Sequence, residues 1–236
     1  MQGMPYAGKE LELFQHATVW KKYYGKFIQP FLHGKILEVG AGIGSTTIHL
    51  CNGRQEEWVC LEPDRENWKE LDRRIQNKEL PSCCVPMQGT LEDLPKGKKF
   101  NAILYIDVIE HIANEKAELQ KAGELLEPGG HLIILVPAHQ RLYSPFDKAI
   151  GHHRRYNKKM LKAAVPAGLS LKAARYFDSV GMIASMMNKY FLKQDYPSLR
   201  QINFWDGVLV RISKITDPLT AYNLGKSLIG IWKRPN

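Results

Sequence analysis

A glycine-rich loop at the end of a short apolar run constrains the fold of this chain more than any other feature. Residues 36–39 read Ile-Leu-Glu-Val, and three glycines spaced two apart follow at Gly40, Gly42 and Gly44. Such a run is typical of a buried parallel strand, and glycines let the backbone turn sharply and approach a ligand closely. A helical pattern opens at residues 45–47, where free N–H groups would face the loop. The loop therefore predicts a nucleotide-type site at the carboxyl end of the first strand of an open α/β sheet.

A second strand is predicted over residues 58–61, and it ends in the acid Glu62. An ionised carboxylate at this position can accept hydrogen bonds from both hydroxyls of a ribose. The alternative is that Glu62, which precedes Pro63, only starts the helix predicted over 64–75, for which Asp64 is the expected N-cap. Enzymes that use NAD also place an acid here, so Glu62 by itself does not identify the cofactor.

Three further segments continue the alternation of strands and helices. A third strand at 83–87 leads into Gly-Thr-Leu-Glu-Asp-Leu-Pro, and a fourth strand at 102–106 ends in Asp-Val-Ile-Glu-His-Ile. A helix over 115–127 is expected to stop at Glu-Pro-Gly-Gly, residues 127–130, and a fifth strand follows at 131–137.

The order of these segments over residues 36–137 resembles that of class I S-adenosylmethionine-dependent methyltransferases that act on small molecules. The G-x-G-x-G spacing matches the first motif of that family, whereas a dinucleotide loop reads G-x-G-x-x-G. A dehydrogenase would supply the first two segments but not the rest. The resemblance implies S-adenosylmethionine as cofactor and a seven-stranded, mostly parallel Rossmann-like α/β sheet with helices on both faces. The cofactor-binding residues that it implies are Glu38, Gly40, Ala41, Gly42, Gly44, Glu62, Pro63, Thr90, Leu91, Ile106 and Asp107.

One position departs from the family pattern. The family usually places an aspartate against the exocyclic amine of adenine, and this chain has Thr90 there. A threonine hydroxyl accepts that hydrogen bond more weakly than a carboxylate. We therefore expect either Thr90 or the backbone of Leu91 to contact the adenine.

A basic and aromatic block follows the fifth strand, over residues 141–159. It resembles a block in bacterial methyltransferases often found among glycan and cell-surface biosynthesis enzymes. The block leaves the sheet at the end where ligands bind, and the planar fork of arginine suits a carboxylate or phosphate. We therefore expect an anionic acceptor, such as a sugar acid or a phosphate-linked glycan or lipid precursor. Adjacent helical residues point about 100° apart, so one of Arg154 and Arg155 is expected to reach substrate while the other braces the loop. The alternative is a solvated basic helix start. The predicted substrate residues are Tyr143, His153, Arg154, Arg155 and Tyr156.

The predicted reaction is an in-line displacement in which positioning of the acceptor supplies most of the acceleration. An oxygen acceptor also requires a general base with a pKa near the working pH, which points to histidine. The candidates are His111 after the fourth strand, which could instead brace its loop, and His139, His152 and His153 after the fifth. The sequence leaves open which histidine acts and whether the acceptor atom is oxygen, nitrogen or carbon.

The chain is expected to form a single methyltransferase domain over 1–236. Its predicted parts are an N-terminal helical cap at 1–34, a cofactor-binding core at 35–137 and a substrate-side region at 138–236. Two apolar helices are predicted in an insertion at 180–221, before the last strand at 227–232. We favour a substrate lid for this insertion; a dimer face and a patch that touches membrane lipid remain open, as does the oligomeric state.

Composition limits the alternatives. The formal net charge of +9 makes an RNA methyltransferase the runner-up. The fourth-strand segment lacks the Pro-Pro-aromatic turn used for exocyclic nitrogens of bases, so we expect a small-molecule, glycan or lipid-precursor acceptor and no nucleic-acid partner. A non-catalytic cofactor-binding scaffold is the other alternative. The four cysteines form no C-x-x-C pair, so no metal is expected. No apolar stretch approaches about twenty residues and the N-terminus lacks a secretory signal, which predicts a cytoplasmic protein.

Overall fold

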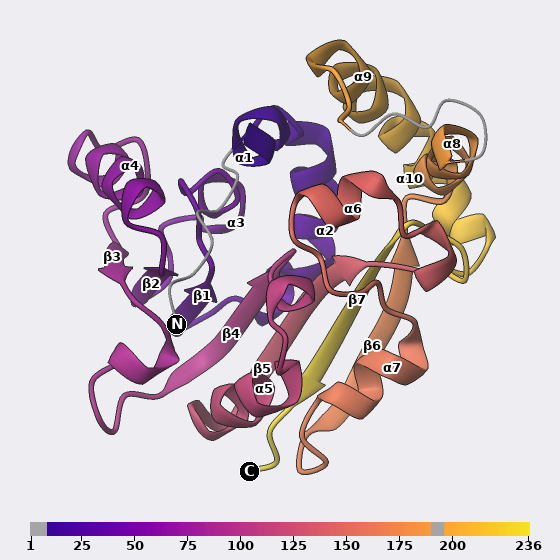
Figure 1. Cartoon of the computed structure of the whole chain (residues 1–236). Helices are drawn as coiled ribbons and strands as arrows, with labels where there is room; N and C mark the ends of the chain where they lie inside the picture. The colour runs from indigo at the N-terminus through magenta and orange to yellow at the C-terminus, as the bar shows by residue number, and fades with distance from the viewer. Residues whose placement is uncertain (1–8, 190–195) are drawn as a thin grey trace.

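In the computed structural model, the described residues 9–189 and 196–236 form a seven-stranded sheet with helices on both faces (Figure 1). The strands lie in the order β3-β2-β1-β4-β5-β7-β6. Strands β1 to β5 are parallel, and β7 runs antiparallel between β5 and β6. The predicted mostly parallel Rossmann-like sheet is therefore confirmed. The strands are β1 (Lys35–Val39), β2 (Glu57–Glu62), β3 (Cys84–Gln88), β4 (Phe100–Ile106), β5 (Leu126–Pro137), β6 (Ser170–Phe177) and β7 (Ser227–Lys233).

Helices precede and connect these strands. The N-terminal region contains α1 and α2, and its first eight residues lie outside the described part of the chain. The α-helices are α1 (Lys9–Phe14), α2 (Thr18–Ile28), α3 (Thr47–Leu50), α4 (Arg65–Gln76), α5 (Glu115–Glu124), α6 (Pro145–Ala149), α7 (Lys158–Ala164), α8 (Ser179–Met187), α9 (Leu199–Phe204) and α10 (Val210–Leu219). Short 3-10 segments are Gln29–Phe31, Leu91–Asp93, Ile109–His111 and Gln140–Leu142.

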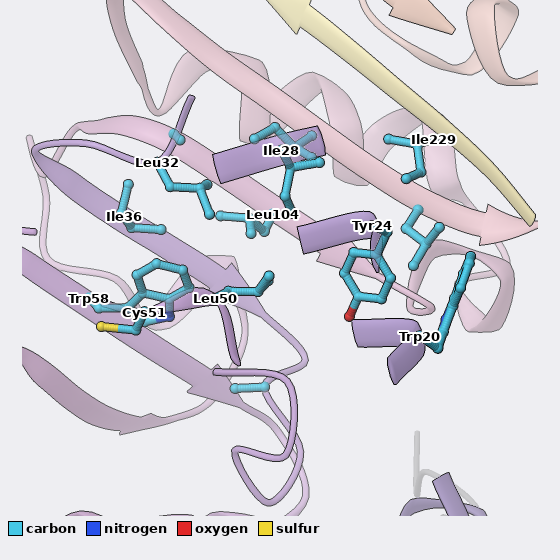
Figure 2. Close-up of a cluster of buried hydrophobic side chains, with 14 of the residues drawn as sticks. Trp20, Tyr24, Ile28, Leu32, Ile36, Leu50, Cys51, Trp58, Leu104 and Ile229 are labelled. Atoms are coloured by element: carbon cyan, nitrogen blue, oxygen red, sulfur yellow. The ribbon is translucent and has the colours of Figure 1, made fainter. Parts of the chain in front are cut away.

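The central strands are buried on both faces because alternate side chains enter two separate apolar cores. In β1, Ile36 packs on the face covered by α2, α3 and α4, whereas the next residue, Leu37, packs on the face covered by α5 and α7. Figure 2 shows Tyr24 and Ile28 of α2 over Ile36 and Leu104 of the sheet. This two-sided burial explains why the strands appear in the sequence as short continuous apolar runs.

The beginning of β5 differs from the prediction. The Glu-Pro-Gly-Gly segment at 127–130 belongs to the strand rather than to a turn, and the preceding helix ends at Glu124. Gly129 has a φ of +77°, and the pairing with β4 shifts register between Phe100 and Ala102. A local irregularity of this kind absorbs extra residues without ending the strand.

The insertion before β7 is more elaborate than the two helices predicted. It contains α8, α9, a π-helical segment at Trp205–Leu209 and α10, which lie together beyond the ends of β6 and β7 (Figure 1). The first predicted helix extended to residues 190–191, which lie outside the described residues. Among the residues that the structure describes, no helix is both long enough and apolar enough to cross a membrane.

Candidate active site

A cavity of about 1520 Å³ lies at the carboxyl ends of the parallel strands. Its wall includes the ends of β1, β2 and β4, together with residues of α1, α2, the basic block and the insertion. Pockets for one small molecule usually occupy roughly 300–1,000 Å³. The cavity therefore has room for two ligands side by side.

The glycine loop forms one part of this wall. The backbone N–H groups of Gly40 and Ala41 both donate to the carbonyl of Leu61, at 2.8 and 3.0 Å, and this fixes the turn after β1. Gly40 has a φ of +69°, and a Cβ atom there would lie 2.7 Å from Cγ2 of Val108. A larger residue would therefore strain the backbone and collide with the loop after β4.

Glu62 lies beside this turn and is 5% exposed. One carboxylate oxygen accepts from the N–H of Gly42 at 2.7 Å, and the other accepts from the N–H of Asp64 at 3.0 Å. Burial raises the pKa of the Glu62 carboxyl, although these two hydrogen bonds oppose the effect. The Asp64 side chain accepts from the N–H groups of Glu66 and Asn67, so Asp64 is the N-cap of α4, as expected.

Most of the residues implied for the cofactor line the cavity, but three do not. Those on the wall are Gly40, Ala41, Gly42, Glu62, Pro63, Thr90, Ile106 and Asp107. Gly44 packs instead against Leu71 and Leu80, and Leu91 is buried. The third, Glu38, accepts hydrogen bonds from Thr47 Oγ1 and Trp58 Nε1, both at 2.8 Å. Burial raises the pKa of the Glu38 carboxyl to about 7.

Next to the end of β4, the cavity wall is made of acidic side chains and histidine rings. The Glu110 side chain is fully buried, and neither carboxylate oxygen has a hydrogen-bond partner among the described residues. Burial, reinforced by Asp107, raises the pKa of Glu110 well above its usual range. Desolvation also raises the pKa of Asp107 to about 6, against the nearby positive charges of Lys226, Lys21 and Arg155.

His152 is held next to Glu110 by a buried aspartate. Its Nδ1 lies 2.8 Å from Oδ1 of Asp147, and its Nε2 lies 3.8 Å from Oε1 of Glu110. Asp147 also accepts from Arg155 Nε at 2.8 Å and from the N–H and hydroxyl of Ser144. Although burial opposes ionisation, the hydrogen bonds from His152 and Arg155 prevail and lower the pKa of Asp147. An ionised Asp147 favours the tautomer of His152 that carries its proton on Nδ1.

His111 and His139, two further candidates for the general base, differ in position. His111 lines the cavity with its ring centroid 4.6 Å from that of His152, and burial next to His152 and His153 lowers its pKa to about 4. His139 is not among the described cavity residues; its ring stacks on Tyr176 at 4.7 Å. The structure therefore brings His111 and His152 together at the cavity, whereas His139 and His153 are not among the described wall residues.

Of the five predicted substrate residues, Arg155 lines the described cavity wall. Arg154 instead donates to the carbonyls of Ile112 and Ala113 and pairs with Glu115, so it braces the loop before α5. The other three residues are also held by the fold. Tyr143 donates to the carbonyl of His152, Tyr156 is buried with its hydroxyl 3.4 Å from the carbonyl of Ile109, and the backbone of His153 donates to that of Glu110.

Two lysines on the wall were not predicted from the sequence. Lys21 on α2 donates to the carbonyl of Phe14 at 2.9 Å, and burial lowers its pKa to about 8. Lys226, just before β7, has its Nζ 3.5 Å from Asp178 and 3.7 Å from the ring centroid of Trp205, and burial lowers its pKa. No sequence signal marks these lysines, because their place on the wall depends on how the two ends of the chain meet at the sheet.

Comparisons with known proteins agree with this architecture. A family model described as a methyltransferase domain matches residues 15–192, and the chain belongs to this family. Its fold is the Rossmann-like fold of class I methyltransferases. A solved coclaurine N-methyltransferase bound to N-methylheliamine and S-adenosylhomocysteine has a TM-score of 0.61 and 14% sequence identity, and the match covers 92% of this chain and 72% of that one.

Two curated relatives match part of the chain. A mitochondrial ubiquinone biosynthesis O-methyltransferase of Dictyostelium discoideum is 26% identical over 112 residues, which cover 42% of this chain and 34% of the relative. Norajmaline N-methyltransferase of Rauvolfia serpentina is 28% identical over 131 residues, covering 54% of this chain and 42% of the relative. The matches thus span less than half the length of these two relatives.

Proposed function

We propose that this protein transfers the methyl group of S-adenosylmethionine to a hydroxyl oxygen of a small-molecule acceptor that carries an anionic group. Membership of the methyltransferase family supports the reaction class. The names of the relatives include both an O-methyltransferase and an N-methyltransferase, so the choice of acceptor atom rests on the side chains of the cavity.

The wall formed by the ends of β1 and β2 fits the cofactor. Each carboxylate oxygen of Glu62 already accepts one backbone N–H and retains a further lone pair for a ribose hydroxyl. Gly40, with a φ of +69°, allows the tight turn against Val108 that brings the loop backbone to the cavity wall. When bound, S-adenosylmethionine supplies an electrophilic methyl group that needs little further activation. The main task of the protein is then to orient the acceptor and remove its proton.

The main support for an oxygen acceptor is the presence of Glu110, His111 and His152 together on the cavity wall. An amine acceptor attacks through its lone pair, whereas a hydroxyl must lose a proton as it attacks. A buried carboxylate beside an imidazole that Asp147 orients is suited to hydroxyl deprotonation. The wall therefore offers a base that a hydroxyl needs during the transfer, whereas an aliphatic amine needs one only to lose its ammonium proton before it attacks.

Arg155 supports an anionic acceptor. It lines the cavity, and Asp147 occupies its Nε, one of the five N–H groups of its guanidinium. Lys21 and Lys226 add two more cations to the same wall. A carboxylate or phosphate on the acceptor would meet favourable charge here.

The test measures release of S-adenosylhomocysteine with phenols, sugars and amines, each with and without a carboxylate or phosphate, and with an RNA oligonucleotide. We expect turnover of an anionic hydroxyl compound and a loss of about 100-fold or more in Glu110→Gln and His152→Gln. His153→Gln is the matched control, because it alters the neighbouring histidine, which is not among the described wall residues. Preferred turnover of an amine or of RNA, or full activity in Glu110→Gln, would contradict the proposal.

A further inference from the structure

We infer that Glu110, His111 and His152 bind one divalent transition-metal cation on the acceptor side of the cavity. Cysteine spacing predicted no metal site, and the site proposed here uses a carboxylate and two imidazoles instead. One ligand atom from each of the three residues lies within 4.8 Å of the others. Two histidines and one carboxylate form a common ligand set for zinc and related cations, with open positions left for water or substrate.

The burial of Glu110 is the first observation behind this inference. Its side chain has no exposed surface, and both of its oxygens lack a hydrogen-bond partner among the described residues. A buried carboxyl group without partners is costly, and such groups in native proteins usually meet a donor, a water or a cation. Oε1 lies 3.8 Å from Nε2 of His152, so a cation between them would contact both atoms.

Asp147 is the second observation. A histidine that binds a metal through one ring nitrogen usually donates the other N–H to a carboxylate or carbonyl, which fixes the ring. His152 has this arrangement, because its Nδ1 lies 2.8 Å from the buried Asp147 while its Nε2 is turned toward Glu110. Arg155 and Ser144 hold Asp147 in turn. The supporting contacts of a metal ligand are therefore built into the fold.

A catalytic role for the cation depends on the proposed function, whereas the inference that the cation binds does not depend on it. A cation on the acceptor side would lower the pKa of a bound hydroxyl. With the cation bound, Glu110 and His152 serve as its ligands and not as the base. The O–H bond then breaks with its proton going to solvent, and the oxygen forms a bond to the methyl carbon. The S–C bond breaks with its electron pair retained on sulfur, which yields S-adenosylhomocysteine.

A second group of possible ligands serves as an internal control. Cys51, Cys83 and Cys84 also lie close together, with 3.3 Å between the sulfurs of Cys51 and Cys83. They lie near the start of β3, away from the carboxyl ends, and none of them is among the described cavity residues. A cation bound by these thiols would respond to Cys83→Ser and not to changes at Glu110.

The experiment titrates the chelator-treated full chain with Zn²⁺, Co²⁺ or Mg²⁺ by calorimetry and follows the visible absorption of the Co²⁺ form. We expect one equivalent of Zn²⁺ or Co²⁺ to bind tightly, and Glu110→Gln and His152→Gln to abolish that binding. Asp147→Asn should weaken it by about 10- to 100-fold, and Cys83→Ser should leave it unchanged. Thermal unfolding of each variant checks that it is folded.

No binding by the wild type, or binding that persists in Glu110→Gln and disappears in Cys83→Ser, would overturn the inference. The proposed function would still stand if the chelated protein methylates a hydroxyl acceptor. A protein that binds the cation at Glu110 but forms no S-adenosylhomocysteine with any acceptor would support the inference and refute the proposed function.

Discussion

At the scale of single residues, the two arginines of the basic block form a matched pair. Arg155 lines the cavity, whereas Arg154 pairs with Glu115 and the loop carbonyls after Ile109–His111. Because lysine replaces arginine poorly in a bidentate contact, Arg155→Lys should reduce kcat/KM for the anionic acceptor by about 10-fold or more. Arg154→Lys should leave kcat/KM near the wild-type value, as measured by release of S-adenosylhomocysteine. Equal losses in both variants would argue against a contact between Arg155 and the acceptor.

Glu62 allows the cofactor assignment to be tested directly. Glu62→Ala removes the carboxylate proposed to bind the ribose, and we expect binding of S-adenosylhomocysteine to weaken by about 1–3 kcal/mol in calorimetry. Glu66→Ala, on the exposed side of α4, is the control and should bind normally. Binding of NAD by the wild type, with none of S-adenosylhomocysteine, would refute the assignment.

Glu38 is expected to make stability depend on pH. Its pKa is about 7 in the fold and 4.5 in a model peptide, so the folded state binds the proton more tightly. The stabilising effect is complete below pH 4.5 and is lost as the pH rises toward 7, a change of about 3 kcal/mol for this group. Glu38→Gln mimics the protonated form, because one oxygen accepts both hydrogen bonds.

Urea unfolding of the wild type, Glu38→Gln and the control Glu66→Gln between pH 5 and 8 measures this effect. We expect the free energy of unfolding to fall more steeply with pH in the wild type and in the control than in Glu38→Gln. Parallel curves for all three proteins would mean that Glu38 does not titrate in this range.

At the scale of elements, buried aspartates tie parts of the insertion to the rest of the fold. Asp206 in the π-helical segment accepts from the backbone N–H groups of Val19 and Trp20 and so caps α2. Asp217 of α10 accepts from the hydroxyl of Tyr23 at 3.0 Å and from the backbone where α8 begins. These contacts fix α10 and the start of α8 on α2, and they leave the end of α8 and α9 as the part suited to move.

We therefore predict a lid made of the end of α8 and of α9, which contribute Ile183, Met187 and Phe204 to the cavity wall. Trypsin should cleave after the exposed Arg200 of α9 in the free protein, and S-adenosylhomocysteine with acceptor should slow that cleavage, because lids belong to the less stable parts of a fold. Arg211 of α10 is also exposed and serves as the internal control. If mass spectrometry shows that ligands leave cleavage after Arg200 unchanged, the insertion is not a lid.

Whether a feature depends on local or distant residues decides what the sequence could predict. The glycine loop and the apolar runs of β1 and β4 are local patterns, so the sheet and the position of the cavity were predictable. The cap of α2 was not, because Asp206 lies far from Val19 in the chain and no local pattern joins them. The expectation that one of Arg154 and Arg155 reaches substrate assumed helical spacing, and this assumption was wrong, because both residues lie in non-helical backbone before α7.

At the scale of the whole molecule, the N-terminal and C-terminal parts of the chain form one sheet and one cavity wall. Strand β7 is inserted between β5 and β6, and the cavity wall runs from Leu11 near the N-terminus to Ser227 at the start of β7. Since both apolar cores draw on early and late strands, no part of the sheet can be removed without exposing them. The cap, the core and the substrate-side region should therefore differ in function, but they should not fold as separate units.

This continuity predicts a single unfolding transition for the whole chain. Calorimetric and van't Hoff enthalpies should agree, and S-adenosylhomocysteine at 100 times its Kd should add about 2.7 kcal/mol of stability, because it binds only the folded state. In a domain of this size, that gain corresponds to a rise of roughly 5–10 °C in Tm. Differential scanning calorimetry with and without ligand measures both quantities, and Glu62→Ala, which binds more weakly, should show a smaller rise at the same ligand concentration. Two resolved transitions, of which the ligand shifts one, would mean that the substrate-side region unfolds as a separate domain.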